Sequence, residues 1–292
     1  MDFEKMYRQL DEFMKNKGNM SEEEALKKFM ELYNSHDLDI EDTNEVMSIE
    51  KLDEAMEAKD EKDAKRLAKE ALNLDPNNAD AKLFLLGFED DLKKLDGLDK
   101  IIKETEDYLT KEGFFDEDNI GEFYVLYETR PYMRILYTKA ITLLENGMVK
   151  RAQEVLERIL ELNENDNLGA RYLLSGVYAY FEDKDSLNKL IKKYEGDFGL
   201  SFDLAKLVLV YKEGDEKKAL EYLKVLNKKN PNFIGIMTDK IGHDEIINKV
   251  NLSYYSLGDL SEAVNMIADF SFVLLPMTMF YVWIRKNAKK LK

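Results

Sequence analysis

The 292-residue sequence has no cysteine, which excludes disulfide bonds, a thiolate nucleophile and a metal site with cysteine ligands. Its two histidines, His36 and His243, are far apart in the chain, so a histidine metal cluster is not expected. Proline occurs four times and glycine 14 times, a composition typical of helices rather than of strands joined by tight turns. These shortages predict a helical protein without a cofactor.

Basic residues are scarce relative to acidic ones. Lysine and arginine together number 43 and aspartate and glutamate 59, which gives a net charge of −16 at pH 7. A chain of this charge lacks the positive field that binding to a nucleic-acid backbone requires, so no nucleic-acid partner is expected. The segment MDFEKMYRQLDEF carries charges throughout, unlike a signal peptide. We expect a cytoplasmic protein.

Signatures of catalysis are missing as well. The glycines are dispersed rather than gathered in a phosphate-binding loop, and neither GxSxG nor HExxH occurs. The acidic run DEDN at 116–119 lacks the spacing and terminal glutamate of a calcium loop, which favours a solvated loop. We therefore expect a non-catalytic protein, with an enzyme built on carboxylates as the less favoured alternative.

What the sequence does contain is one heptapeptide in several versions. GDEKKAL at 214–220 matches GMVKRAQ at 147–153 and GDLSEAV at 258–264, and KDEKDAK at 59–65 has lysine in place of the glycine. The alanines of the first two versions are 67 residues apart, close to two periods of 34. A period near 34 is characteristic of tetratricopeptide repeats, each of which is a helix–turn–helix.

Aligning the chain on these alanines predicts five units, at 45–78, 133–166, 167–199, 200–233 and from 244 onward. Gly147, Gly214 and Gly258 are expected to end the first helix of their units as left-handed C-caps. The alanine five residues later lets the second helix approach the first closely. A single unit cannot bury its own apolar face, so the units must stack. The expected fold is an all-α, tetratricopeptide-like α-solenoid of antiparallel helix pairs; unrelated helical hairpins are the alternative.

The rest of the chain divides into segments of the same solenoid. Residues 1–42 predict an N-terminal helical pair, at about 3–17 and 21–35, in which Ser21 and Glu24 form a capping box. Residues 43–127 predict divergent repeat-like helices, and residues 128–292 predict repeats that end in a capping helix. The segment 231–244 is expected to be an ordered connection between the last two units.

Residues 270–284, FSFVLLPMTMFYVWI, form an uncharged run that is followed by five basic residues. An apolar run before a basic one is typical of a tail anchor, but 15 residues fall short of the roughly 20 that span a bilayer. Pro276 also lies in the middle of the run. We expect a terminal helix that packs against the preceding unit, and membrane association is not favoured.

Two motifs carry a family resemblance. ETRPYMR at 128–134 precedes the first clear repeat, and an NDN–Gly–x–Arg–Tyr stretch at 165–172 begins the next. These motifs resemble a bacterial family of tetratricopeptide-repeat proteins, and the likeness covers about 128–285. There is also a fainter likeness in layout to the suppressor-of-tumorigenicity family. The resemblance implies a helical-repeat fold and no particular reaction.

In arrays of this kind, positions 2, 5, 9 and 12 of each first helix tend to line a concave binding face. Counting them gives a tyrosine at position 12 in three successive units; the last unit contributes Glu245, Asn248, Leu252 and Tyr255. Tyrosine and arginine side chains commonly supply the binding energy of protein interfaces. The residues expected to bind a protein or peptide partner are Arg130, Arg134, Tyr137, Arg171, Tyr172, Tyr178, Tyr211 and Tyr255.

Each of these residues also has a structural alternative. The arginines can pair with carboxylates such as Glu128 or Asp166, and the tyrosines can pack between helices. Besides a peptide-binding scaffold, two functions stay open: a regulatory sensor that changes its superhelical pitch on binding a peptide, and a scaffold tethered to a membrane by 270–284. The charge of the partner and the oligomeric state also stay open.

Overall fold

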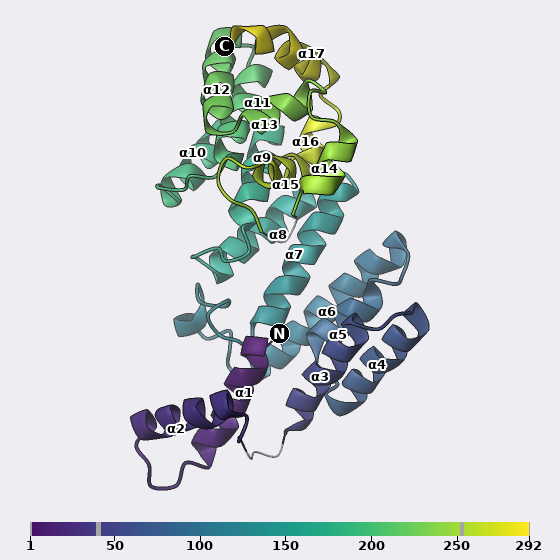
Figure 1. Cartoon of the computed structure of the whole chain (residues 1–292), viewed down its shortest axis with the longest axis vertical. Coiled ribbons are helices and arrows are strands. Elements are labelled where there is room, and N and C mark those ends of the chain that lie inside the picture. The colour runs from purple at the N-terminus through teal and green to yellow at the C-terminus, as the bar shows by residue number, and fades with distance from the viewer. Residues whose placement is uncertain (1, 39–41, 252–253, 292) are drawn as a thin grey trace. The chain divides into compact units, whose positions relative to one another are not determined.

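The computed structural model describes residues 2–38, 42–251 and 254–291 and is all-helical over these ranges, without a strand (Figure 1). Helices that follow one another in the chain pack in adjacent pairs, which confirms the predicted all-α solenoid architecture. The chain divides into two compact units. Unit 1 comprises Met1–Lys139 and Glu161–Asn165, and unit 2 comprises Ala140–Leu160 and Asp166–Lys292.

In unit 1, α1 contacts both α2 and α3, and each helix from α3 to α6 contacts the next one along the chain. The helices are α1 (Asp2–Lys15), α2 (Glu22–Ser35), α3 (Asn44–Met56), α4 (Glu61–Leu74), α5 (Ala79–Leu86), α6 (Asp91–Lys111) and the 3₁₀ turn η1 (Glu117–Asn119). The predicted N-terminal pair is confirmed to within two residues. Residues 39–41, between α2 and α3, lie outside the described residues.

Local sequence explains where these helices begin. Ser21 accepts the N–H of Glu24 at 3.2 Å, and the Glu24 carboxylate accepts the N–H of Ser21 at 2.9 Å, so the predicted capping box is confirmed. Small residues explain how the helices pack. The buried cluster at the α3–α4–α5 contact is made largely of alanines, which allow the helix axes to approach. Its members are Leu52, Ala55, Leu67, Ala68, Ala71 and Ala81.

The two helices α7 (Arg130–Glu145) and α8 (Val149–Leu162) have residues in both units. The remaining helices belong to unit 2: α9 (Ala170–Phe181), α10 (Lys184–Lys193), α11 (Ser201–Lys212), α12 (Glu216–Lys229), α13 (Pro231–Met237), α14 (His243–Lys249), α15 (Leu260–Asp269), α16 (Ser271–Leu274), α17 (Thr278–Asn287) and the 3₁₀ turn η2 (Ala288–Lys290). Helix α9 packs against α10 and α11, and α11 packs against α12. The later helices α15 and α16 return to α9, and α17 contacts α13.

The repeated heptapeptide forms the turn between two paired helices. Gly214 has a φ of +81°, its N–H donates to the Tyr211 carbonyl at 3.0 Å, and the N–H of Asp215 donates to Val210 at 3.2 Å. This pair of hydrogen bonds is the Schellman arrangement, which satisfies carbonyls at the end of α11. Gly147 does the same at the end of α7, where the N–H of Met148 donates to Leu143 at 2.8 Å. Both glycines are C-caps, as predicted.

The residue after the turn starts the second helix. The Asp215 carboxylate accepts the N–H of Lys218 at 3.0 Å and so caps α12. Asp60, Asp183 and Asp259 cap α4, α10 and α15 in the same way. The alanines that follow, Ala64, Ala152, Ala219 and Ala263, are 5% exposed or less, as close helix approach requires.

The last predicted unit differs from the expectation. Its first helix, α14, ends at Lys249, and the described residues 250–251 and 254–258 are not helical, so Tyr255 and Gly258 lie outside a helix. Side chains replace the helical hydrogen bonds there: the N–H of Asn251 donates to the Ser261 hydroxyl, and the Asn251 amide oxygen accepts the N–H of Tyr254. The prediction that Tyr255 occupies position 12 of a first helix was therefore wrong. Leu252 lies outside the described residues.

The segment 270–284 is not one helix. It breaks at Pro276 into α16 and α17, because proline lacks the N–H that would continue the helical ladder. Its buried aromatic side chains pack within unit 2, as the predicted terminal helix would. None of the helices in the described ranges combines the length and the apolar character that crossing a bilayer requires.

The conformation of Gly214 generates a prediction about stability. A Cβ at this position would meet no atom within 4 Å, so Gly214→Ala changes only the backbone energy of a left-handed residue. We expect the free energy of unfolding to fall by about 1 kcal/mol. Gly214→Asn is the matched comparison, because asparagine adopts the left-handed conformation more readily than alanine does. Urea unfolding followed by circular dichroism should show a smaller loss for Gly214→Asn than for Gly214→Ala, and equal losses would contradict the prediction.

Candidate functional site

The eight residues predicted to bind a partner are divided between the two units. Arg130, Arg134 and Tyr137 belong to unit 1, and Arg171, Tyr172, Tyr178, Tyr211 and Tyr255 belong to unit 2. Tyr137 is half-buried on α7.

Arg134 holds two helices of unit 1 to α7. Its guanidinium donates to both carboxylate oxygens of Glu4, at 2.7 and 2.9 Å, and to both of Asp80, at 2.9 and 2.6 Å. Only 10% of the Glu4 side chain and 14% of the Asp80 side chain are exposed. Burial alone would lower the pKa of Arg134, but the hydrogen bonds with Asp80 and Glu4 outweigh it and raise that pKa above its ordinary value. These contacts match the structural alternative for Arg134.

Arg130 has a different environment. It donates to the backbone carbonyls of Tyr124, at 2.9 Å, and Val125, at 3.3 Å, in the turn before α7. Its guanidinium also lies over the rings of Tyr7 and Tyr124, 5.9 and 5.7 Å from their centroids. Arg130 therefore fixes the chain that leads into α7.

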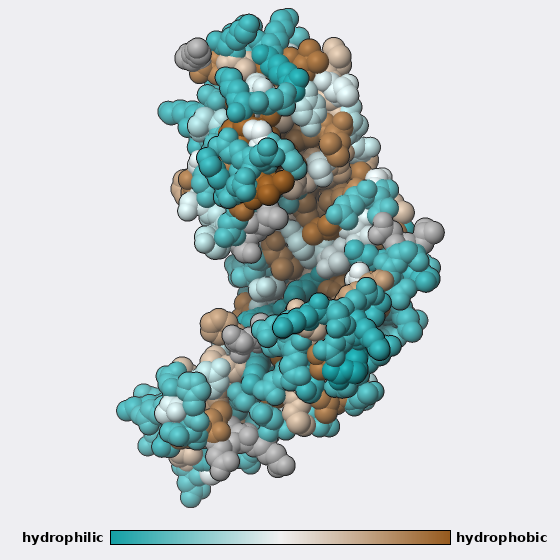
Figure 2. Space-filling model, turned by 45° about the vertical axis from the view of Figure 1, so that its right-hand side comes forward, coloured by the Kyte–Doolittle hydropathy of each residue, from teal (hydrophilic) through white to brown (hydrophobic). Residues whose placement is uncertain are grey.

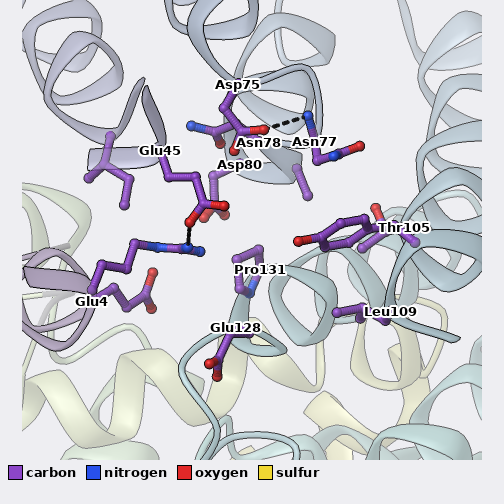
Figure 3. A pocket seen from close by; sticks show the side chains of 14 residues that line it. Glu4, Glu45, Asp75, Asn77, Asn78, Asp80, Thr105, Leu109, Glu128 and Pro131 are labelled. Atoms are coloured by element: carbon purple, nitrogen blue, oxygen red, sulfur yellow. Dashed lines mark hydrogen bonds and ion pairs between the residues drawn. The ribbon is translucent and has the colours of Figure 1, made fainter. Parts of the chain in front are cut away.

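A small acidic pocket lies next to the Arg134 ion pairs, within unit 1. Helices α1, α3 and α6, the turn between α4 and α5, and the start of α7 all contribute to its wall (Figure 3). Its volume is about 50 Å³. The residues that line it are Glu4, Arg8, Glu45, Ile49, Asp75, Asn77, Asn78, Ala79, Asp80, Thr105, Tyr108, Leu109, Glu128 and Pro131.

The local sequence of each element explains how the wall is built. Glu4 and Arg8 are one turn apart on α1, and Glu45 lies in the first turn of α3. The turn after α4 is held by its own side chains: Asp75 accepts the N–H of Asn77 at 2.9 Å, and Asn78 accepts the N–H of Ala81 at 2.9 Å. This turn presents Asp75 and Asp80 to the pocket from either side of Asn78 (Figure 3).

Negative charge exceeds positive charge in this pocket. Glu4, Glu45, Asp75 and Asp80 contribute four carboxylates, whereas the carboxylate of Glu128 points away from them (Figure 3). Two guanidiniums offset them: Arg134 binds Glu4 and Asp80, and Arg8 hydrogen-bonds to Glu45.

Arg8 is not fully satisfied in this position. Its Nε atom is buried without a hydrogen-bond partner, and its guanidinium lies over the Tyr127 ring at 5.3 Å. The four carboxylates and two guanidiniums together leave an excess of two negative charges in the pocket, which favours a positively charged group.

Sequence reasoning missed these carboxylates. They come from residues between 4 and 80 and meet only in the folded unit, and in a chain with 59 acidic residues no spacing distinguishes them. The one usable signal was the repeat ending ALNLDPNN, which contains Asp75 and predicts a tight turn. In the described ranges, no group of three or more histidine, aspartate or glutamate side chains is arranged to hold a metal ion.

In unit 2, the structure brings Arg171 and Tyr172 into one buried polar cluster. Arg171 donates to Asp166 at 2.8 Å and to Asp197 at 2.7 Å, and the Tyr172 hydroxyl donates to Asp197 at 2.9 Å. Asp166 also accepts the N–H groups of Ala170 and Arg171 at the start of α9. Burial would raise the pKa of Asp197, but its hydrogen bonds with Arg171, Gly199 and Tyr172 keep that pKa below its ordinary value.

The remaining predicted tyrosines of unit 2 have different surroundings. Tyr178 is buried and donates to Glu157 at 3.0 Å. The Tyr211 ring packs against Phe280 and Trp283 of α17, with centroids 4.9 and 5.3 Å away. Tyr255 is exposed and lies outside any helix. Part of the predicted binding face is thus covered by the chain's own later helices.

The same covering occurs on α9. Gly176 leaves room for two aromatic rings, because a Cβ there would lie 3.2 Å from Phe270 and 3.3 Å from Phe272. The Phe272 ring also packs near that of Tyr180, with centroids 6.3 Å apart. Aromatic side chains from later segments of the same chain therefore cover parts of α9 and α11.

Removing Arg134 should destabilise the protein strongly, because Glu4 and Asp80 would be left buried without a cation. For Arg134→Ala we expect a loss of about 3 kcal/mol in the free energy of unfolding. Arg66→Ala is the matched control, since Arg66 also bridges two carboxylates, Asp63 and Glu70, but is 55% exposed. Its loss should be much smaller than that of Arg134→Ala, because an exposed ion pair contributes little to stability. Urea unfolding of both variants measures the difference, and similar losses would contradict the structural role of Arg134.

Asp269, the last residue of α15, predicts a pH dependence. Burial raises the pKa of its carboxyl to about 6, so the ionised form is disfavoured in the folded protein. The resulting cost is full above pH 6 and disappears as the pH falls towards the pKa of an unfolded aspartate, near 4. Asp269→Asn should therefore raise the free energy of unfolding by about 2 kcal/mol near pH 7 and leave it unchanged near pH 4.

Urea unfolding at both pH values tests this, with Asp244→Asn in the exposed first turn of α14 as the control. A gain for Asp269→Asn that is the same at both pH values would show that ionisation is not its cause.

Comparison of the sequence with protein-family models and with curated proteins finds no match. The function is therefore inferred from the geometry and charge of the chain's own residues.

Proposed function

We propose that this chain is a non-catalytic helical-repeat scaffold that binds a basic segment of another protein. A lysine or arginine side chain of that segment would enter the acidic pocket of unit 1. The observation that carries the proposal is the pocket itself, where four carboxylates face two guanidiniums in a volume of about 50 Å³.

The volume of the pocket favours a side chain over a small-molecule substrate. A water molecule needs about 10–15 Å³ on this measure, so 50 Å³ holds about four waters or one ammonium or guanidinium head. Pockets for cofactors and drug-sized ligands are commonly several hundred cubic ångströms in volume. The cationic head of a partner would displace a few waters, while the rest of the partner lies on the surface.

The charge of the pocket favours a cation. Asp75 makes a hydrogen bond to the backbone N–H of Asn77, and the described residues place no cation on it. Glu45 has one cationic partner, the guanidinium of Arg8. A partner guanidinium could hydrogen-bond with both carboxylates, and such charge-assisted bonds are stronger than neutral ones.

The repeat pattern supports the scaffold part of the proposal. The second helices α8, α10 and α12 begin at residues 149, 184 and 216, and so recur every 32 to 35 residues. Each of α10 and α12 follows a left-handed residue and an aspartate N-cap. These features agree with a tetratricopeptide-like array, whose common role is to bind segments of other proteins. A role for Tyr178 and Tyr211 in such binding stays a prediction, as does a cytoplasmic location.

Selection of peptides from a displayed random library against the full chain tests the proposal. We expect the selected sequences to share a lysine or arginine at one position. Glu45→Gln together with Asp75→Asn keeps the shape of the wall and removes two negative charges. This double variant should bind a labelled selected peptide at least about tenfold more weakly, as fluorescence polarisation measures.

Glu216→Gln with Glu221→Gln is the matched control, because it removes the same charge from α12 in unit 2. The control should bind as the unchanged chain does. Selected peptides without a common basic residue, or equal weakening in both double variants, would overturn the proposal.

A further inference from the structure

Helix α17 has a second apolar surface besides the one that packs within unit 2. Phe280, Trp283 and Ile284 are buried, and Tyr211 packs against the first two. Met279 and Val282 are exposed, at 70% and 57%. Residues three apart lie on the same side of a helix, so these two side chains form one exposed surface that is distinct from the buried one.

The turn before the helix adds another exposed apolar side chain. Leu275, next to Pro276, is 71% exposed. We call Leu275, Met279 and Val282 the α17 stripe. On the face drawn in Figure 2, hydrophobic residues lie in patches among hydrophilic ones on the unit that contains α17. Three large, exposed apolar side chains this close together need a partner or a non-aqueous surface more than isolated ones do.

Positive charge lies directly beside the stripe. The sequence from 270 to 292 contains five basic residues and no acidic one, in a chain whose net charge is −16. Lys286 comes four residues after Val282 and so lies on the same side of the helix, one turn further on. Lys289 and Lys290 follow in η2.

Most of this charge is not offset by carboxylates. Arg285 donates to Asp239 at 2.5 Å, and Lys290 donates to the amide oxygen of Asn287 at 2.9 Å. Among the described residues, no carboxylate lies within ion-pair distance of Lys286, Lys289 or Lys290. Three ammonium groups are therefore available to an outside anion, next to an exposed apolar stripe.

We propose that α17 and the turn before it bind peripherally to the surface of an anionic lipid bilayer. The α17 stripe would enter the interfacial region, while Lys286, Lys289 and Lys290 contact the lipid headgroups. Apolar side chains flanked by lysines are the arrangement by which peripheral helices bind anionic membranes, and both contributions are needed for stable binding. The buried side of α17 would stay packed in unit 2, so the helix lies on the bilayer without crossing it.

A second copy of the chain fits the same surface less well. Two copies that met through the stripe about a two-fold axis would bring their lysines towards one another, at an electrostatic cost. Three exposed side chains also fall well short of the roughly 800 Å² per partner that a stable protein interface buries. A lipid surface needs only a few inserted side chains and supplies the anions.

Sedimentation of the full chain with vesicles tests the proposal. We expect binding to vesicles that contain equal phosphatidylglycerol and phosphatidylcholine, release when salt is added, and no binding to phosphatidylcholine alone. Met279→Gln with Val282→Gln, and separately Lys286→Gln with Lys289→Gln and Lys290→Gln, should each weaken binding at least about tenfold. Both sets change exposed side chains, and circular dichroism checks that the variants are folded.

The matched controls lie on α12 of the same unit. Val225→Gln removes another exposed apolar side chain, and Lys217→Gln with Lys224→Gln and Lys228→Gln removes the same positive charge. These controls should bind as the unchanged chain does. No binding to anionic vesicles, equal binding to neutral ones, or equal weakening by the controls would overturn the proposal. So would a concentration-dependent dimer in sedimentation velocity that is lost in Met279→Gln with Val282→Gln, because the stripe would then be a contact between copies.

Discussion

The paired helices of this chain have apolar sides that they cannot bury alone, and the stacking of helix pairs satisfies that requirement. The turns make the stacking possible. A left-handed residue such as Gly214 ends one helix, an aspartate such as Asp215 begins the next, and an alanine such as Ala219 lets the two axes approach. The recurrent heptapeptide therefore has a structural role in the turns. Side chains outside it are the candidates for binding a partner.

Different interactions hold helices that are distant in the sequence together in the two units. Unit 1 uses charge: Arg134 binds Glu4 and Asp80, and this keeps α1 and the start of α5 in contact with α7. Unit 2 uses aromatic packing, because Phe270, Phe280 and Trp283 of the later helices cover α9 and α11. The result leaves an acidic pocket in unit 1 and an apolar, basic surface on α17. The two features have opposite charge, so they suit different partners: a basic protein segment and an anionic lipid surface.

Local rules were enough to predict most of the helices. The Ser21 capping box predicted the start of α2, periodicity and the glycine turns predicted the helix pairs within 45–78 and 133–229, and the all-α class followed from them. The prediction was wrong where side chains compete with the helical backbone. Asn251 and Ser261 hydrogen-bond to backbone N–H groups and leave Tyr255 outside a helix, and Pro276 divides the segment 270–284 in two.

The sequence by itself determined the helical class, the turns and the strongly negative charge, because these depend on composition and on residues within a few positions of one another. Only the tertiary structure decided what surrounds the predicted site residues. Arg134 reaches Glu4 across 130 residues, and Tyr211 reaches Trp283 across 72. No local pattern encodes such pairings when 59 carboxylates and 31 phenylalanine and tyrosine rings are available. Tertiary packing determines which of these residues pair. A buried charge needs an opposite charge beside it, and a buried ring needs neighbours whose side chains pack closely around it.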